Sequence, residues 1–160
     1  MTEEWKDGEI DGLVFREAVK YTDERGWLAE VFRSDEVPED LMPVMSYVSV
    51  TLPGVTRGPH KHESQTDMFG FFGPGMFRTR FWDAREGSPT YGNSLTREVG
   101  EENPTVVVVP PGVVHGYTNI SENEAWVMNF PNRLFRGEGR EEPVDEIRYE
   151  DVPDHPYSME

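Results

Sequence analysis

The stretch Val106-Val107-Val108-Val109-Pro110-Pro111-Gly112-Val113-Val114-His115-Gly116-Tyr117 decides the fold of this chain. Its four consecutive valines are typical of a strand that is buried on both faces. A turn of proline and glycine follows, and an imidazole comes next at His115. The pattern predicts a buried strand, a tight turn, and a histidine delivered to a strand end, where the interior of a β-barrel can form a site.

Short strand patterns also occur on both sides of this stretch, separated by turns rich in glycine and proline. Strands spaced by about ten residues with turns between them are typical of a sandwich or barrel. Helical periodicity is weak and confined to residues 36–42, and the chain from Gly137 is expected to be an irregular, solvated acidic tail. At 160 residues, the sequence predicts a single domain over residues 1–160. The predicted strands are Leu13–Phe15, Trp27–Phe32, Tyr47–Leu52, Met68–Phe72, Met76–Trp82, Asn93–Val99, Val106–Val109 and Glu124–Phe130.

Composition excludes several classes of function. The chain has no cysteine, so disulfides, thiol nucleophiles and cysteine-based zinc sites are excluded. Its net charge of −16, from 15 Lys and Arg against 31 Asp and Glu, makes nucleic acid and anionic membranes poor partners. The longest apolar stretch is too short to span a bilayer, and no basic, apolar leader begins the chain. We therefore expect a cytoplasmic location.

A second histidine segment, Gly54-Val55-Thr56-Arg57-Gly58-Pro59-His60-Lys61-His62, lies upstream of Asp67. On a strand, His60 and His62 project to the same face because they are two residues apart. Imidazoles with a carboxylate form a usual set of ligands for a divalent metal. With His115 as a further nitrogen, the candidate metal ligands are His60, His62, Asp67 and His115. A strand-borne histidine facing a dry barrel interior can instead abstract a proton next to a ketone.

Both histidine segments resemble the two sequence motifs of the cupin superfamily. Within that superfamily, five ordered segments resemble the dTDP-4-dehydrorhamnose 3,5-epimerase family, from about Gly12 to Asp151. The family resemblance implies an all-β jelly roll (a double-stranded β-helix) with a short helical or irregular tail. It also implies a homodimer that needs no metal and acts on a nucleotide-linked 4-keto-6-deoxyhexose. The matching segments are Asp23–Glu30, Val55–His60, Gln65, Asp83–Gly92 and Pro110–Tyr117.

Carried over by position, the resemblance assigns roles to single residues. His60 matches the catalytic base and Asp83 an acid in the active-site region. The positions that match substrate contacts or the pocket are Arg25, Glu30, Arg57, His115 and Asn129. Arginines suit a nucleoside diphosphate because they can make bidentate phosphate contacts. Asp83 and Arg85 are also candidates for a purely structural ion pair.

The chain departs from the family at the groups that move protons. Asp67 stands where the family has a lysine, and an ionised aspartate cannot donate a proton to an enolate. Asn129 and Phe135 stand where the family has tyrosines, and the chain ends at Glu160, before the aspartate that pairs with the base. Met45 and Tyr47 replace a glutamine and an asparagine that read the nucleotide.

Three hypotheses therefore stay open. The first is a sugar-nucleotide 3,5-epimerase, an isomerase without a cofactor, with His60 as base. The second is a cupin that binds a divalent metal. The third is a non-catalytic protein that binds a carbohydrate or sugar nucleotide.

Overall fold

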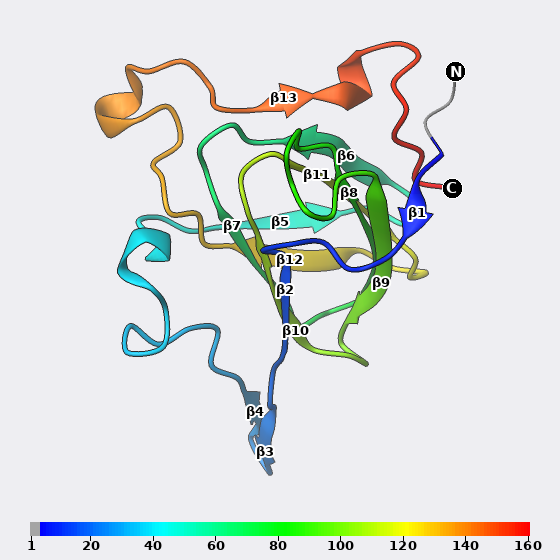
Figure 1. Cartoon of the computed structure of the whole chain (residues 1–160). Coiled ribbons are helices and arrows are strands. Elements are labelled where there is room, and N and C mark those ends of the chain that lie inside the picture. The colour runs from blue at the N-terminus through cyan, green and yellow to red at the C-terminus, as the bar shows by residue number, and fades with distance from the viewer. Residues whose placement is uncertain (1–3) are drawn as a thin grey trace.

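Two facing β-sheets form the body of the protein in the computed structural model, which describes residues 4–160. Figure 1 shows their strands wrapped around a common interior, the all-β jelly roll that the sequence predicts. The six-stranded sheet contains, in spatial order, β1 (Lys6–Asp7), β9 (Asn93–Gly100), β8 (Met76–Asp83), β11 (Val113–Asn119), β6 (Thr56–Lys61) and β13 (Ile147–Arg148). The five-stranded sheet contains β2 (Val14–Glu17), β10 (Thr105–Val109), β7 (Asp67–Phe71), β12 (Ala125–Asn129) and β5 (Tyr47–Thr51).

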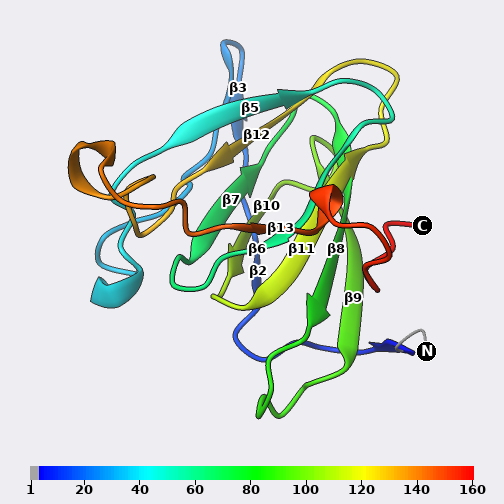
Figure 2. The same cartoon turned by 90° about the horizontal axis from the view of Figure 1, so that it is seen from above.

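A separate hairpin of β3 (Tyr21–Asp23) and β4 (Gly26–Leu28) projects away from both sheets (Figures 1 and 2). Gly26, which follows the turn between these two strands, has a φ of 126°, a backbone conformation that favours glycine. The second hairpin strand is shorter than predicted. It ends at Leu28 rather than Phe32, and residues 29–32 carry no strand assignment.

The predicted irregular tail is more ordered than the sequence indicated. It contains β13, which pairs antiparallel with β6, so Arg148 lies opposite His60. Farther on, the Tyr157 side chain is buried against Trp82. The expectation of a solvated tail is therefore wrong for these parts, because one adds a strand to a sheet and the other covers an outward-facing tryptophan. The 3-10 helices are Glu39–Leu41, Glu138–Arg140 and Tyr149–Asp151. No helix within residues 4–160 has the length and apolar character needed to cross a membrane.

The valine run forms an internal strand of the five-stranded sheet and is largely buried, as predicted. Strand β10 lies between β2 and β7, and Val106, Val107 and Val109 are almost fully buried. Between the two sheets, aromatic and aliphatic side chains from alternate strand positions form the largest core cluster. Six large aromatic side chains are almost fully buried, namely Phe69, Phe71, Phe72, Phe77, Phe81 and Trp82. This packed core fixes the strands that carry the histidines.

Candidate functional site

Gly58 lets β6 and β11 approach each other closely beside His60. It has a φ of 91°, and a Cβ at this position would lie 2.6 Å from the carbonyl oxygen of His115. The pairing register on β11 shifts between His115 and Tyr117, a local irregularity of the bulge type. A side chain at position 58 would push the strands apart, so glycine is required here.

His60 and His115 lie directly opposite each other on this strand pair. Residues opposite each other on neighbouring strands project to the same face of the sheet. Their ring centroids are 4.5 Å apart, and the His62 ring lies 6.0 Å from that of His60. The structure thus brings together the three histidines that the two sequence segments supply.

Asp67, the first residue of β7, lies between two of these rings. Its Oδ2 atom is 3.2 Å from Nε2 of His62 and 3.2 Å from Nε2 of His115. Its Oδ1 atom accepts hydrogen bonds from Nε2 of Gln65 at 2.8 Å and from Nδ2 of Asn129 at 2.9 Å. The carboxylate is 1 % exposed, so it joins both sheets at a buried point.

Backbone carbonyl groups fix the tautomers of His62 and His115. Nδ1 of His62 is 2.6 Å from the carbonyl oxygen of Asp145, and Nδ1 of His115 is 3.0 Å from that of Val113. A carbonyl oxygen only accepts, so each Nδ1 carries the hydrogen and donates it. Each Nε2 that faces Asp67 therefore holds a lone pair when its ring is neutral.

The charges of the cluster follow from burial and proximity. Burial lowers the pKa of His62, but the Asp67 carboxylate outweighs burial and raises that pKa to about 9. Burial and the neighbouring His60 lower the pKa of His115. Burial raises the pKa of Asp67, yet the two imidazoles hold it well below its ordinary value. The favoured state is an ionised Asp67 with a protonated His62 and a neutral His115.

Two glutamates of the tail lie beside His60. Its Nδ1 atom is 3.8 Å from Oε1 of Glu146 and 3.9 Å from Oε2 of Glu150. They flank β13, whose Arg148 is paired with His60. Sequence reasoning missed both, although the alternation Glu146-Ile147-Arg148-Tyr149-Glu150 fits a strand that sends both carboxylates to one side.

A pocket of about 1290 Å³ opens beside the cluster. His60 and His62 come from the six-stranded side, and Tyr47 and Phe69 from the five-stranded side. Further pocket residues include Arg57, Gln65, Tyr117, Glu146 and Glu150. The pocket thus combines imidazoles, carboxylates, hydroxyls and guanidinium groups in a space large enough for an organic substrate.

Arg57 lines the pocket and is partly held by backbone and hydroxyl oxygens. Its Nε donates to Oγ1 of Thr51 at 2.9 Å, and its Nη2 donates to the carbonyl oxygen of Val50 at 2.7 Å. No carboxylate within residues 4–160 forms an ion pair with it at 4.0 Å or less. Its positive charge therefore stays available for an anionic ligand.

Asn129 does not line the pocket but connects two residues of the site. Its Nδ2 group donates to the hydroxyl oxygen of Tyr47 at 2.9 Å as well as to Asp67. Asn129 and Tyr47 are paired residues on β12 and β5. Sequence reasoning treated Tyr47 only as a lost nucleotide contact, because the cross-strand register that joins it to Asn129 is not visible in the sequence.

Asp83 does not lie among the pocket residues, contrary to the position expected of an acid in the active-site region. Its oxygens accept from Nε and Nη2 of Arg85 at 2.8 and 2.9 Å, and from the hydroxyls of Ser88 and Thr90, each at 2.6 Å. The structural pair of Asp83 and Arg85 that the sequence suggested is present. All of these donors lie within seven residues of Asp83. The buried carboxylate therefore stabilises the turn that follows β8.

Arg25 and Glu30 are also absent from the pocket of their own chain. Arg25 lies on the projecting hairpin, where its side chain is 81 % exposed and pairs with Asp23. Glu30 lies beyond the hairpin, with Oε1 3.8 Å from Nη1 of Arg33. Within one chain, the structure does not bring these two predicted substrate contacts to His60.

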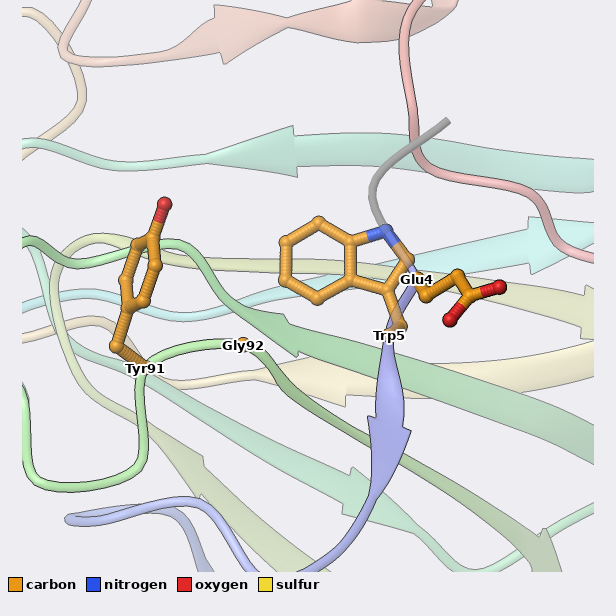
Figure 3. Close-up of a pocket in the computed structure, with 4 residues that line it drawn as sticks. All are labelled: Glu4, Trp5, Tyr91 and Gly92. Carbon is orange, nitrogen blue, oxygen red and sulfur yellow. The ribbon is translucent and has the colours of Figure 1, made fainter. Parts of the chain in front are cut away.

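A second, smaller hollow lies near the start of the described chain. Figure 3 shows the residues that line it, Glu4, Trp5, Tyr91 and Gly92. The volume of this hollow is about 160 Å³. Trp5 also contacts Tyr157, with ring centroids 5.6 Å apart. Without histidine, lysine or arginine in its lining, this hollow offers far fewer chemical groups than the pocket beside His60.

Comparison with protein families gives one match that spans most of the chain. The model described as dTDP-4-dehydrorhamnose 3,5-epimerase matches residues 7–143. A probable low-salt glycan biosynthesis epimerase, Agl13, of Haloferax volcanii is 39 % identical over 134 residues, which cover 83 % of this chain and 85 % of the relative. The spore coat polysaccharide biosynthesis protein SpsL of Bacillus subtilis is 36 % identical and covers 76 % of this chain and 79 % of its own.

Solved structures agree with this fold. A dTDP sugar isomerase of Desulfovibrio desulfuricans superposes with a TM-score of 0.80 at 24 % identity, covering 93 % of this chain and 91 % of the other. The Legionella pneumophila dTDP-6-deoxy-D-glucose-3,5-epimerase, in complex with dTDP-4-keto-L-rhamnose, superposes with a TM-score of 0.75 at 25 % identity. It covers 90 % of this chain and 76 % of its own.

Proposed function

Because this chain belongs to the dTDP-4-dehydrorhamnose 3,5-epimerase family, we propose that it epimerises a nucleotide-linked 4-keto-6-deoxyhexose. The observation that supports this most directly is His60 in a large pocket, beside two carboxylates. The keto group makes the hydrogen on a neighbouring carbon acidic, and a positioned imidazole is suited to remove it.

In this proposal, Nε2 of His60 is the basic atom. Nδ1 faces Glu146 and Glu150, and these carboxylates favour the tautomer in which Nδ1 carries the hydrogen. They also stabilise the imidazolium that forms when Nε2 takes up the substrate proton. Glu146 and Glu150 thus act as positioning residues for the base.

Arg57 would bind the diphosphate of the substrate. Two of its nitrogens are held by oxygens of Thr51 and Val50, and Nη1 has no such partner among the described residues. This arrangement fixes the guanidinium plane at the pocket wall, and a fixed plane suits phosphate recognition. In a chain with net charge −16, a cation free of carboxylates is a specific attraction for an anionic ligand.

We further propose that the active form is a homodimer in which Arg25 and Glu30 reach the pocket of the partner subunit. The hairpin that carries Arg25 exposes Tyr21, Trp27 and Leu28, each at least 49 % exposed. Apolar groups gathered on a projecting hairpin are a usual sign of a protein interface. A second copy would cover them and supply substrate contacts that one chain lacks.

Mixing two inactive variants tests this dimer. Arg25→Ala lacks the hairpin cation and His60→Ala lacks the base, but a heterodimer of the two contains one complete pocket. We expect each variant alone to be inactive and the refolded mixture to regain part of the wild-type activity. A mixture that elutes as a dimer yet stays inactive would contradict the shared site.

The reaction itself is tested with dTDP-4-keto-6-deoxyglucose in deuterated water, followed by NMR at C3 and C5. The wild-type protein should incorporate deuterium at one or both carbons. His60→Ala should reduce incorporation by about 10²- to 10⁴-fold, the range for loss of a general base. Absence of exchange in the wild-type protein at high substrate concentration rejects the proposal. Saturable binding without exchange would instead support a non-catalytic binding protein.

A divalent metal site is a second candidate, favoured by the geometry around Asp67. When neutral, Nε2 of His115 is buried with no hydrogen-bond partner among residues 4–160, and its lone pair faces an anionic oxygen 3.2 Å away. A cation between them would resolve that conflict. At His62 and His115, Nδ1 donates to a backbone carbonyl group and leaves Nε2 as the ligand atom. This arrangement is typical of metal-binding histidines.

The residues fit such an ion by donor type and spacing. His60, His62 and Asp67 each offer a ligand atom within 4.8 Å of the others, and His115 lies beside them. Imidazole and carboxylate together suit Zn²⁺, Mn²⁺, Fe²⁺ or Ni²⁺. When bound, the ion would act as a Lewis acid on a carbonyl oxygen.

Elemental analysis of protein purified without chelator, followed by calorimetric titration with Zn²⁺ and Mn²⁺, tests this site. A metal site predicts stoichiometric binding that is lost in His62→Ala. No bound metal, and no uptake on addition, rejects it. The epimerase proposal survives that result, because proton transfer by His60 requires no ion.

A further inference from the structure

The reaction proposed above needs a second proton-transfer group besides His60. Inverting a carbon centre removes a hydrogen from one face and returns one to the opposite face. Asp67 is not placed to return it, because its side chain is 1 % exposed and does not line the pocket. A neutral donor must therefore face His60 from the other wall of the pocket.

We propose that Tyr47 is this donor, and that it delivers a proton to the face of the substrate opposite His60. The inference rests on the proposed epimerase function. Tyr47 is the first residue of β5, at the edge of the five-stranded sheet, while His60 lies on β6 of the six-stranded sheet. Both line the same pocket, so a sugar ring bound there lies between walls that come from different sheets.

The hydrogen bonds of Asn129 give the Tyr47 hydroxyl its direction. Oδ1 of Asn129 accepts from the backbone N–H of Met68 at 3.1 Å, which fixes the orientation of the amide. The Nδ2 group donates one hydrogen to Asp67 Oδ1 and the other to the Tyr47 oxygen, both at 2.9 Å. The Tyr47 oxygen is therefore an acceptor in this contact, and its own hydrogen remains available for the pocket.

The surroundings also keep the phenol protonated until it reacts. Burial raises the pKa of Tyr47, the hydrogen bond from Asn129 lowers it, and the negative charge of Asp67 raises it further. The net shift is upward, so the hydroxyl is neutral at physiological pH. Asn129 then stabilises the phenolate that forms after donation, because its N–H group still points at the oxygen.

Tyr117 is a poorer candidate for the same role. It lies on β11, in the same sheet as His60, and its ring contacts Phe69, Phe71 and Phe77. Its side chain is nearly fully buried within this aromatic cluster. A donor there approaches from the wall of the base, and proton return from that wall restores the original configuration.

The step balances as follows. The C–H bond next to the keto group breaks, the proton moves to Nε2 of His60, and the electron pair forms an enolate. The O–H bond of Tyr47 then breaks while a new C–H bond forms on the opposite face and the carbonyl is restored. The imidazolium loses its proton and the phenolate regains one through solvent in the open pocket, with no other reactant.

The test separates exchange from inversion. With dTDP-4-keto-6-deoxyglucose in deuterated water, we expect Tyr47→Phe to form inverted product about 10²-fold or more slowly. Deuterium entry into the substrate with retained configuration should persist within a few-fold of wild type, because His60 still removes the proton. Tyr91→Phe, which removes a tyrosine hydroxyl outside this pocket, should retain inversion. Circular dichroism and thermal unfolding check that each variant is folded.

Each alternative outcome has a distinct meaning. Inversion at the wild-type rate in Tyr47→Phe overturns the inference while leaving the epimerase function intact. Equal loss of exchange and inversion in a folded Tyr47→Phe also overturns it, because the hydroxyl would then assist proton removal or binding. No exchange in the wild-type protein overturns this inference together with the proposed function.

Discussion

Two buried aspartates, Asp67 and Asp83, differ in where their partners come from. Donors within seven residues surround Asp83, in the turn after its own strand. Asp67 has local partners in His62 and Gln65, but it also contacts His115 of β11 and Asn129 of β12, which come from distant strands. Donors from the same turn stabilise that turn, whereas titratable groups from distant strands form a functional site. The comparison teaches that the origin and chemistry of the partners identify a functional carboxylate better than its burial.

The largest effect on stability is expected from Asp83→Asn. The change leaves the Arg85 guanidinium facing a neutral amide at a position where the acid is fully buried. Breaking a buried ion pair from one side costs about 3 kcal/mol, near the lower end of the usual range because Arg85 is partly exposed. Urea unfolding measures the loss. If Asp83 is only structural, exchange by the folded protein stays within a few-fold of wild type, and a large loss would restore its catalytic assignment.

Asp67→Asn should show the opposite balance, with a larger effect on activity than on stability. The amide keeps the shape of the side chain but removes the charge that orients His62 and His115. Removing a buried partner that orients functional histidines typically reduces activity by about 10- to 100-fold. Deuterium exchange measures this loss, and circular dichroism checks the fold. Full activity in Asp67→Asn would show that the cluster is as structural as the turn around Asp83.

The carboxylates beside His60 represent an intermediate case, because they are partly exposed and come from the tail. The double variant Glu146→Gln and Glu150→Gln keeps both side-chain shapes while removing their charges. We expect exchange to slow by about tenfold, because these carboxylates orient the imidazole and stabilise the imidazolium that forms during the reaction. The matched control Glu122→Gln and Glu141→Gln changes the same net charge at exposed positions outside the pocket, and an equal loss there would contradict a specific role.

These three carboxylate groups also show how far the sequence could predict the site. The valine run, the alternating strands and the spacing of His60, His62 and His115 predicted the all-β fold and the convergence of the histidines. Glu146 and Glu150 were missed because they reach His60 only through the pairing of the two-residue strand β13 with β6, which the sequence does not reveal.

Tyr47 was undervalued for a similar reason. Its hydroxyl reaches the site through a cross-strand contact with Asn129, and that contact depends on the register of β5 against β12. Arg25 and Glu30 show the reverse case. Their positions match the family in sequence, yet the projecting hairpin carries Arg25 away from the pocket of its own chain. Local patterns predict strands and the faces of side chains, whereas register and chain pairing decide which distant groups meet.

The smallest expected effect is the pH dependence that Asp83 contributes to stability. Burial raises its pKa, but donation from Arg85, Ser88 and Thr90 dominates and holds the pKa well below the ordinary value. A depressed carboxyl pKa stabilises the folded state above the unfolded value of about 3.9, and that contribution declines as pH falls towards the folded pKa. The difference in unfolding free energy between wild type and Asp83→Asn should therefore be constant from pH 7 to pH 5 and shrink below about pH 4. Urea titrations of both proteins across this range measure it. A difference that stays constant at low pH would mean that packing, rather than the charge of Asp83, stabilises the turn.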